Sequence, residues 1–117
     1  MPNMDVKELG IDLIEIKRFS AAKNNRQNKF LLNNYSQKEL DYCFSFKNSG
    51  PHLAGTWAAK EAVFKILGRD DILFSSIEIR RRKNGQPTIW LSNHQQKSIA
   101  VSISHTAKLA IAIALKK

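Results

Sequence analysis

LAGTWAAKEAVFKILG, residues 53–68, predicts one long amphipathic helix. Pro51 stands where a first-turn proline is tolerated, and Gly68 stands where a glycine commonly ends a helix. With about 100° between successive residues, one broad side of this helix is apolar and is expected to face the core. That side carries Leu53, Ala59, Val63, Phe64, Ile66 and Leu67.

The opposite side of the same helix is narrow and polar. Glu61 and Lys65, one turn apart, lie between the small residues Ala54 and Ala58, which leaves room for a bound ion or phosphate. The two charged residues could equally form an ordinary i,i+4 surface pair. Lys60 projects among apolar neighbours, where its stem can be buried while its ammonium reaches solvent.

The composition is that of an ordinary globular protein. The chain has 117 residues, 43% of them hydrophobic, and we expect residues 1–117 to form a single domain. Its net charge of +9 favours an anionic partner, such as nucleic acid, acidic lipid, a phosphorylated cofactor or an acidic protein. One cysteine, Cys43, excludes an intramolecular disulfide and fits a reducing compartment. Because neither a secretory signal nor a run of membrane-spanning length is apparent, we expect a cytoplasmic protein.

The N-terminal third is predicted to be a strand followed by helix. Lys7–Asp12 reads as the strand, and Asp12 either caps the next helix or is a carboxylate for metal binding or catalysis. Leu13–Leu32 is predicted to be mainly helical, with a break near Asn24. Between Ile16 and Lys38 every charged residue is basic, which indicates either a solvated face or a docking surface for an acidic partner. The basic residues are Lys17, Arg18, Lys23, Arg26, Lys29 and Lys38.

Ser36 and Glu39 form a capping box, which predicts a helix over Gln37–Phe46. Its expected buried residues are Leu40, Tyr42, Cys43 and Phe44.

His52, at the start of the long helix, is interpreted as a surface or capping group. Arg69–Asp71 reads as a polar turn.

The C-terminal part is predicted to consist of strands. Ser75–Arg82 and Pro87–Leu91 are joined by Asn84-Gly85, a strong hairpin signal. Ile99–His105 and Leu109–Leu115 form a second pair. Because the helices come first and an antiparallel meander follows, the predicted class is α+β, with the N-terminal strand and helices packed on the meander.

The last two strands alternate bulky and small residues, and neither face carries charge. Alanines let another surface approach closely, so a second copy of the chain is one expected packing partner. The alternative is that the chain's own long helix covers the alanine face. The alanines are Ala100, Ala110, Ala112 and Ala114.

Several short motifs follow one another along the chain. They are Gly10-Ile11-Asp12-Leu13 with Glu15 and Arg18, Ser36-Gln37-Lys38-Glu39-Leu40, Leu53-Ala54-Gly55, Trp57-Ala58-Ala59-Lys60-Glu61-Ala62 with Lys65, Ile77-Glu78-Ile79, Asn84-Gly85-Gln86-Pro87 and Val101-Ser102-Ile103-Ser104-His105-Thr106. In this order they resemble the holo-acyl-carrier-protein synthases, which are small phosphopantetheinyl transferases. The resemblance extends from about Glu8 to Leu115 and implies the phosphopantetheinyl transferase fold.

The resemblance implies a reaction and a set of site residues. The reaction is Mg²⁺-dependent transfer of 4′-phosphopantetheine from coenzyme A to a serine of apo acyl carrier protein, with release of adenosine 3′,5′-bisphosphate, in fatty acid biosynthesis. By similarity Asp12 and Glu61 are the Mg²⁺ ligands, and Glu61 and Lys65 are catalytic. Lys60, Lys65 and His105 are expected to contact coenzyme A.

The resemblance also implies partners. We expect acyl carrier protein to dock on Arg18, Lys23, Arg26 and Lys29, and the chain to form a homotrimer whose coenzyme A clefts lie between subunits. We expect neither nucleic acid nor a membrane as partner.

Two positions depart from the family pattern. Glu8 stands where a glycine is usual, and Thr56 stands where an arginine is common, so coenzyme A is bound less tightly or another cation replaces that arginine. Two alternatives remain open from sequence. One is a catalytically impaired homologue that acts as a binding subunit, and the other is a small basic nucleic-acid-binding module, although no motif of such modules is present.

Overall fold

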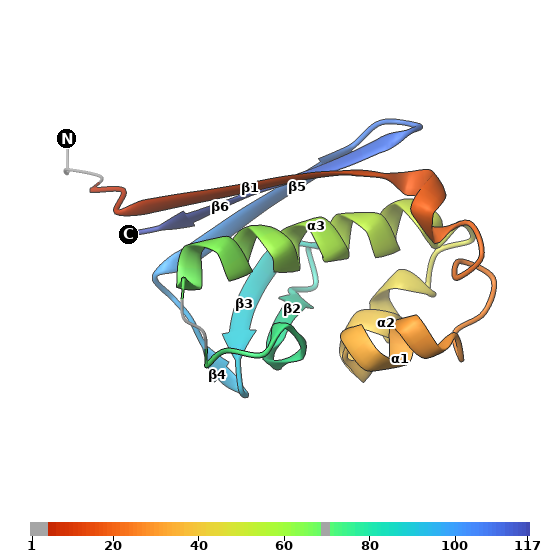
Figure 1. Cartoon of the computed structure of the whole chain (residues 1–117), viewed down its shortest axis with the longest axis horizontal. Coiled ribbons are helices and arrows are strands. Elements are labelled where there is room, and N and C mark those ends of the chain that lie inside the picture. Colours follow the sequence, from red (N-terminus) through yellow and green to blue (C-terminus); the bar gives the residue numbers. More distant parts are fainter. Residues whose placement is uncertain (1–4, 69–70) are drawn as a thin grey trace.

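A single long helix, α3 (Gly50–Leu67), lies along one face of a three-stranded antiparallel sheet (Figure 1). The structure is a computed structural model and describes residues 5–68 and 71–117. Pro51 lies in the first turn of α3, and Gly68 ends the helix in the left-handed conformation, at φ 54°. Both predicted ends are confirmed, with α3 beginning three residues before Leu53. Arg69 and Asp70 of the predicted turn lie outside the described residues.

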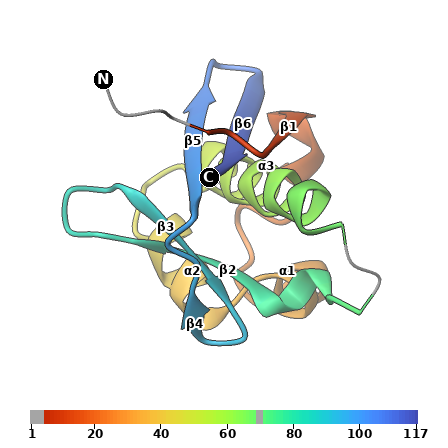
Figure 2. The ribbon, with the colours of Figure 1, turned by 90° about the vertical axis from the view of Figure 1, so that its left-hand side faces the viewer.

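The predicted faces of α3 are only partly correct. Ala54 and Ala58, placed on the polar side, are fully buried, whereas Phe64, placed on the apolar side, is 37% exposed. The reason is that α3 lies between two sheets, as Figure 2 shows, and is therefore covered on most of its circumference. Glu61 and Lys65 lie on the part that stays accessible.

The first strand is longer than predicted. β1 (Glu8–Glu15) pairs antiparallel with β6 (Leu109–Lys116) over its whole length, and Asp12 lies opposite Ala112 in mid-strand. Asp12 is therefore not a helix cap. The prediction of helix over Leu13–Leu32 is wrong at its start, because hydrogen bonding to the distant β6 keeps the chain extended to Glu15. It is also wrong over residues 20–28, which form turns.

Short helices connect β1 to α3. A 3₁₀ turn (Ile16–Phe19) is followed by α1 (Lys29–Asn34) and α2 (Gln37–Cys43). The predicted capping box is confirmed, since the Ser36 hydroxyl accepts a hydrogen bond from the Glu39 amide and the Glu39 carboxylate accepts one from the Ser36 amide. α2 ends at Cys43, earlier than predicted. Leu40 and Cys43 are buried as expected, and Tyr42 and Phe44 are half-buried.

The remaining strands confirm the α+β class but divide into two sheets rather than one meander. After a 3₁₀ turn (Phe74–Ser76), one sheet has the order β2-β3-β4, and the other has the order β1-β6-β5. The predicted hairpin turn is confirmed, with Gly85 at φ 88°. The strands are β2 (Ile77–Arg81), β3 (Pro87–Leu91), β4 (His94–Gln95) and β5 (Ile99–His105).

The chain's own helix covers the alanines of β6. Ala110, Ala112 and Ala114 are completely buried beneath α3, so the expectation that a second copy meets this face is wrong. In the β5–β6 register, Val101 lies opposite Ala114 and Ile103 opposite Ala112. Bulky residues of one strand thus share a face with alanines of the next, which lets α3 pack closely on β6.

The outer face of the same sheet is apolar and open to solvent. The exposed fractions of Leu9, Ile11 and Leu13 on β1 are 68%, 53% and 60%. Leu109 and Ile113 on β6 continue this face, at 38% and 41%. We call these five residues the outer apolar face. A contiguous apolar surface of this kind marks an interaction site.

Candidate active site

Gly10 brings β1 into close contact with α3. A Cβ atom at this position would lie 2.1 Å from the carbonyl oxygen of Ala62, so only a glycine allows the strand to approach the helix this closely. Asp12 follows two residues later and therefore points to the same side of β1, toward the helix. Glu61 precedes Ala62 on α3, and the close approach places the two carboxylates side by side. A glycine two residues before the aspartate was the sequence signal for this contact.

The two carboxylates influence each other. Burial and the negative charge of Asp12 raise the pKa of Glu61, while the positive charges of Lys65 and Arg18 act in the opposite direction. The side chain of Asp12 is 20% exposed, and Glu61 is half-buried. Two partly desolvated carboxylates at close range repel each other unless a cation lies between them.

Lys65 is held beside this pair. Its ammonium donates a hydrogen bond to the carbonyl of Ile11 at 2.7 Å and lies 3.6 Å from the Asp12 carboxylate. The side chain remains 52% exposed, so the ammonium is both positioned and accessible. The structure thus brings together four of the predicted residues, Asp12, Arg18, Glu61 and Lys65, which we call the carboxylate cluster.

The donor set of this cluster fits Mg²⁺. Within the described residues there is no group of three or more histidine, cysteine, aspartate or glutamate side chains that could enclose a metal ion. A pair of accessible carboxylates is nevertheless sufficient for Mg²⁺, which retains several waters and completes its shell with substrate phosphates. Asp12 and Glu61 supply such a pair.

Lys60 lies elsewhere, inside the core. Its side chain is fully buried, and its ammonium donates to the Glu39 carboxylate at 2.9 Å and to the carbonyl of Asn34. The rings of Tyr35 and Phe74 surround it at 5.5 and 5.2 Å. A buried ammonium already paired with a buried carboxylate is not accessible to a ligand. The prediction that Lys60 contacts coenzyme A is therefore wrong, and its role in the structure is to join α3 to α2.

His105 is also separate from the carboxylate cluster. It ends β5, where its ring lies 6.0 Å from the ring of His52 in the first turn of α3. Glu61 follows His52 by nine residues, which is about 13.5 Å along a helix axis. Within one chain, His105 and the carboxylate cluster therefore lie at different positions along α3.

The predicted docking residues do not form one uniform surface. Arg18 belongs to the carboxylate cluster, and Lys29 begins α1 in an exposed position. Lys23 lines a cavity of about 530 Å³ between the start of α3 and the β5–β6 turn. Arg26 forms an ion pair with Asp41 of α2, a partner that the acid-free stretch of sequence does not reveal.

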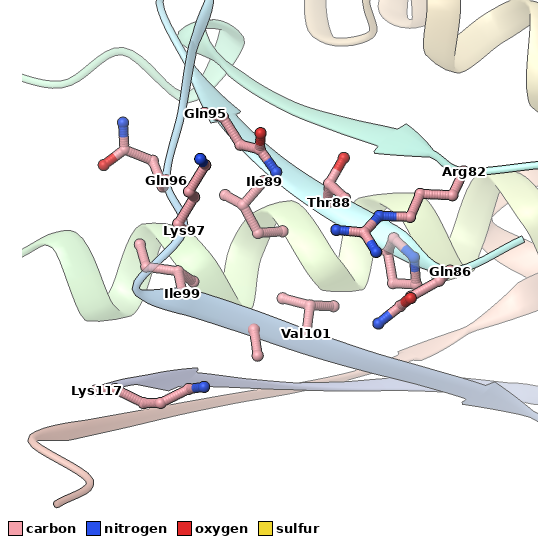
Figure 3. Close-up of a pocket in the computed structure, with 12 residues that line it drawn as sticks. Arg82, Gln86, Thr88, Ile89, Gln95, Gln96, Lys97, Ile99, Val101 and Lys117 are labelled. Carbon is pink, nitrogen blue, oxygen red and sulfur yellow. The ribbon is translucent and has the colours of Figure 1, made fainter.

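Another cavity, of about 570 Å³, lies between β3 and β5 (Figure 3). Ile89 of β3 and Ile99 and Val101 of β5 line it with apolar side chains. The basic side chains that line it are Arg82, Lys97 and Lys117. None of the predicted site residues contributes to its lining.

The comparisons with known proteins agree with this geometry. Residues 8–114 match the family described as the 4′-phosphopantetheinyl transferase superfamily. A holo-[acyl-carrier-protein] synthase of Bacillus subtilis is 38% identical over 109 residues, which cover 89% of each chain. The chain belongs to the holo-acyl-carrier-protein synthases. Membership in this family makes it a transferase.

Solved structures of holo-acyl-carrier-protein synthases share its fold. The Helicobacter pylori enzyme, solved in complex with coenzyme A, matches with a TM-score of 0.77 and 29% identity over 94% of this chain and all of the other. The Bacillus anthracis enzyme, solved in complex with CoA (3′,5′-ADP), has the same TM-score and 26% identity, over 95% and 96% of the two chains. Among the described residues, no helix combines the length and hydrophobicity needed to cross a membrane.

Proposed function

We propose that this holo-acyl-carrier-protein synthase uses the carboxylate cluster to transfer 4′-phosphopantetheine from coenzyme A to a serine of apo acyl carrier protein, in fatty acid biosynthesis. Adenosine 3′,5′-bisphosphate is the other product. The observation that carries the proposal is the convergence of Asp12, Glu61 and Lys65 at the contact between β1 and α3. We place the enzyme in the cytoplasm, which the buried, unpaired Cys43 supports.

The protein's task in phosphoryl transfer is mainly to position the reactants and neutralise charge. Asp12 and Glu61 would hold Mg²⁺, which when bound neutralises the diphosphate that these carboxylates alone would repel. Lys65, oriented by its bond to the Ile11 carbonyl, binds a phosphate oxygen as a point charge. Glu61 would also accept the serine proton, directly or through a water molecule.

Release of adenosine 3′,5′-bisphosphate tests the proposal. We expect release only when coenzyme A, Mg²⁺ and apo carrier are all present, and none with a carrier whose acceptor serine is replaced by alanine. If the protein binds the carrier but releases no nucleotide, it is an impaired homologue that acts as a binding subunit.

We further propose that an acidic helix of the carrier docks near Arg18, with Lys23, Arg26 and Lys29 extending the surface. Arg18 is exposed, and its charge acts on Glu61, which links the docking surface to the reaction site. Arg18→Glu should raise the KM for the carrier at least tenfold more than the KM for coenzyme A, because like charges then meet at the interface. Lys83→Glu, which also reverses one positive charge but lies on the distant β2–β3 hairpin, is the matched control. Equal effects of Arg18→Glu on both KM values would count against this surface.

We also propose a homotrimer in which the outer apolar face is covered by neighbouring subunits. The exposed Leu9, Ile11 and Leu13 support this proposal, and so does the separation of His105 from the carboxylate cluster within one chain. A site shared between subunits would bring His105 of one subunit to the carboxylate cluster of another. Mixed trimers of Asp12→Asn and His105→Ala subunits should regain part of the activity that each variant lacks. A fully active species at 13.3 kDa in light scattering would refute the assembly.

A further inference from the structure

The cavity between β3 and β5 shares no residue with the carboxylate cluster (Figure 3). It is a groove of about 570 Å³, which we call the β3–β5 groove. Three apolar side chains, those of Ile89, Ile99 and Val101, line it, and both isoleucines are buried. An apolar lining of this kind receives the apolar parts of a ligand.

The charged side chains that line the groove are all basic. Arg82 follows β2, Lys97 precedes β5 and Lys117 follows β6, so three separate segments each contribute one cation. All three residues are exposed, and within residues 5–68 and 71–117 none of them forms an ion pair. In the same part of the chain, no acidic side chain lines the groove. The charge therefore favours an anionic ligand.

β5 also presents a free backbone edge to the groove. In the sheet order β1-β6-β5 it is the outermost strand, and no strand lies on its other side within the described residues. The Lys117 amide donates a hydrogen bond to the Ser98 carbonyl at 2.9 Å, so the backbone of Ser98 faces β6. Because successive residues of a strand direct their N–H and C=O groups to opposite sides, those of Val101 and Ile103 point away from β6. Such an edge is a template for a further strand.

The apolar lining, the cations and the free edge together fit an extended acidic peptide. A chain that adds to a strand edge directs alternate side chains to one face. Apolar residues at alternate positions would then lie against Ile99 and Val101, and the acidic residues between them would meet Arg82 and Lys97. A compact anion such as phosphate would use the cations but neither the apolar lining nor the strand edge.

We propose that the β3–β5 groove binds an extended acidic segment of a partner protein, which adds to β5 as a further strand. The backbone of Val101 forms hydrogen bonds with the segment, and Arg82, Lys97 and Lys117 provide the complementary charge. The groove is an anchoring site, separate from the carboxylate cluster and from the surface near Arg18. It goes beyond the proposed function, because its binding requires neither coenzyme A nor Mg²⁺.

Fluorescence anisotropy with a short labelled peptide tests the proposal on the full chain. The probe contains three glutamates that alternate with two valines. We expect it to bind at least tenfold more tightly than the same peptide with lysine in place of glutamate. Lys97→Glu should weaken binding of the probe about tenfold, because like charges then meet in the groove. Lys38→Glu is the matched control and should change binding less than threefold, since this exposed lysine of α2 lies outside the groove.

Methylation of backbone nitrogens tests the addition to β5. One form of the probe is methylated on the valine amides and a second form on the glutamate amides. Because alternate residues of a strand direct their amides to the same side, one form should lose at least tenfold in affinity and the other less than threefold. Val101→Pro removes the amide at the free edge and should weaken binding of the unmethylated probe, whereas Val101→Ala should retain it. Proline is tolerated at an edge where its nitrogen faces no neighbouring strand.

Four results would overturn the proposal. Equal affinity for the two methylated forms would show that the peptide does not add to β5, and this comparison needs only the wild type if Val101→Pro does not fold. Equal losses in Lys97→Glu and Lys38→Glu would show attraction to the overall charge of +9. Displacement of the probe by inorganic phosphate, but not by sodium chloride of the same ionic strength, would identify a site for small anions. Failure of the wild type to bind the probe would also overturn it, and a smaller assembly of Lys97→Glu in light scattering would then assign the groove to a second copy of the chain.

Discussion

Replacing Gly10 by alanine tests whether the contact between β1 and α3 sets the geometry of the site. The new methyl carbon would lie 2.1 Å from the backbone oxygen of Ala62, whereas ordinary contact begins at 3.4 Å. Backbone atoms cannot rotate away as a side chain can, so β1 must move by about 1.3 Å, the difference of these two distances. This movement separates Asp12 from Glu61, and a misplacement of about 1 Å can cost roughly a hundredfold in rate.

The assay for Gly10→Ala is kcat at saturating coenzyme A, carrier and Mg²⁺, with thermal unfolding measured on the same sample. Gly55→Ala is the matched control on α3, because its methyl group would meet a side chain rather than the backbone, namely the Cγ2 methyl of Ile103, at 3.0 Å. We expect kcat to fall about a hundredfold in Gly10→Ala and less than threefold in Gly55→Ala. A folded Gly10→Ala protein with more than half of the wild-type kcat would refute the reasoning.

Three further predictions concern the metal ligands and the buried groups. Asp12→Asn and Glu61→Gln should each reduce transfer at least a hundredfold while circular dichroism stays unchanged. If either variant keeps most of the wild-type activity at saturating Mg²⁺, the replaced residue is not a Mg²⁺ ligand. Lys60→Met leaves the Glu39 carboxylate buried and unpaired, so urea unfolding should show a loss of about 3–5 kcal/mol; a loss below about 1 kcal/mol would contradict the buried pair. Burial raises the pKa of Cys43 to about 11 from 9.0, so the unfolded chain releases this proton first as the pH rises. The free energy of unfolding should therefore fall between pH 9 and 11 by about 2–3 kcal/mol more in the wild type than in Cys43→Ala, and parallel pH curves would show that the thiol titrates normally.

The parts of the fold that local signals determine were predictable from sequence. Pro51 and Gly68 mark the ends of α3, the Ser36–Glu39 capping box marks the start of α2, and Asn84-Gly85 marks the hairpin. In each case the residue satisfies a backbone requirement of its own segment, so no distant contact is needed to recognise it.

The parts that depend on distant partners were not predictable in the same way. β1 extends to Glu15 because β6, about a hundred residues later, pairs with it. The burial of Lys60 depends on Glu39, twenty-one residues earlier, which accepts its hydrogen bond. Periodicity placed Lys60 among apolar residues but contains no information about the carboxylate that makes complete burial possible.

The candidate site shows the same division. The residue pattern alone left two interpretations open for each of Asp12 and Glu61, and only the family resemblance joined the two residues in one site. The structure supplies the physical reason, which is the close approach at Gly10. The proximity of His52 and His105 was not predictable, because the two residues come from α3 and β5, which only the folded chain brings together.

The most direct test of the central claim is the intact mass of the carrier protein. Apo acyl carrier protein is incubated with the enzyme and coenzyme A, once with Mg²⁺ and once with excess chelator. The account predicts that the carrier gains the mass of one 4′-phosphopantetheine with Mg²⁺ and keeps its apo mass with chelator. An unchanged carrier mass in the presence of Mg²⁺, or full conversion in the presence of chelator, would contradict it.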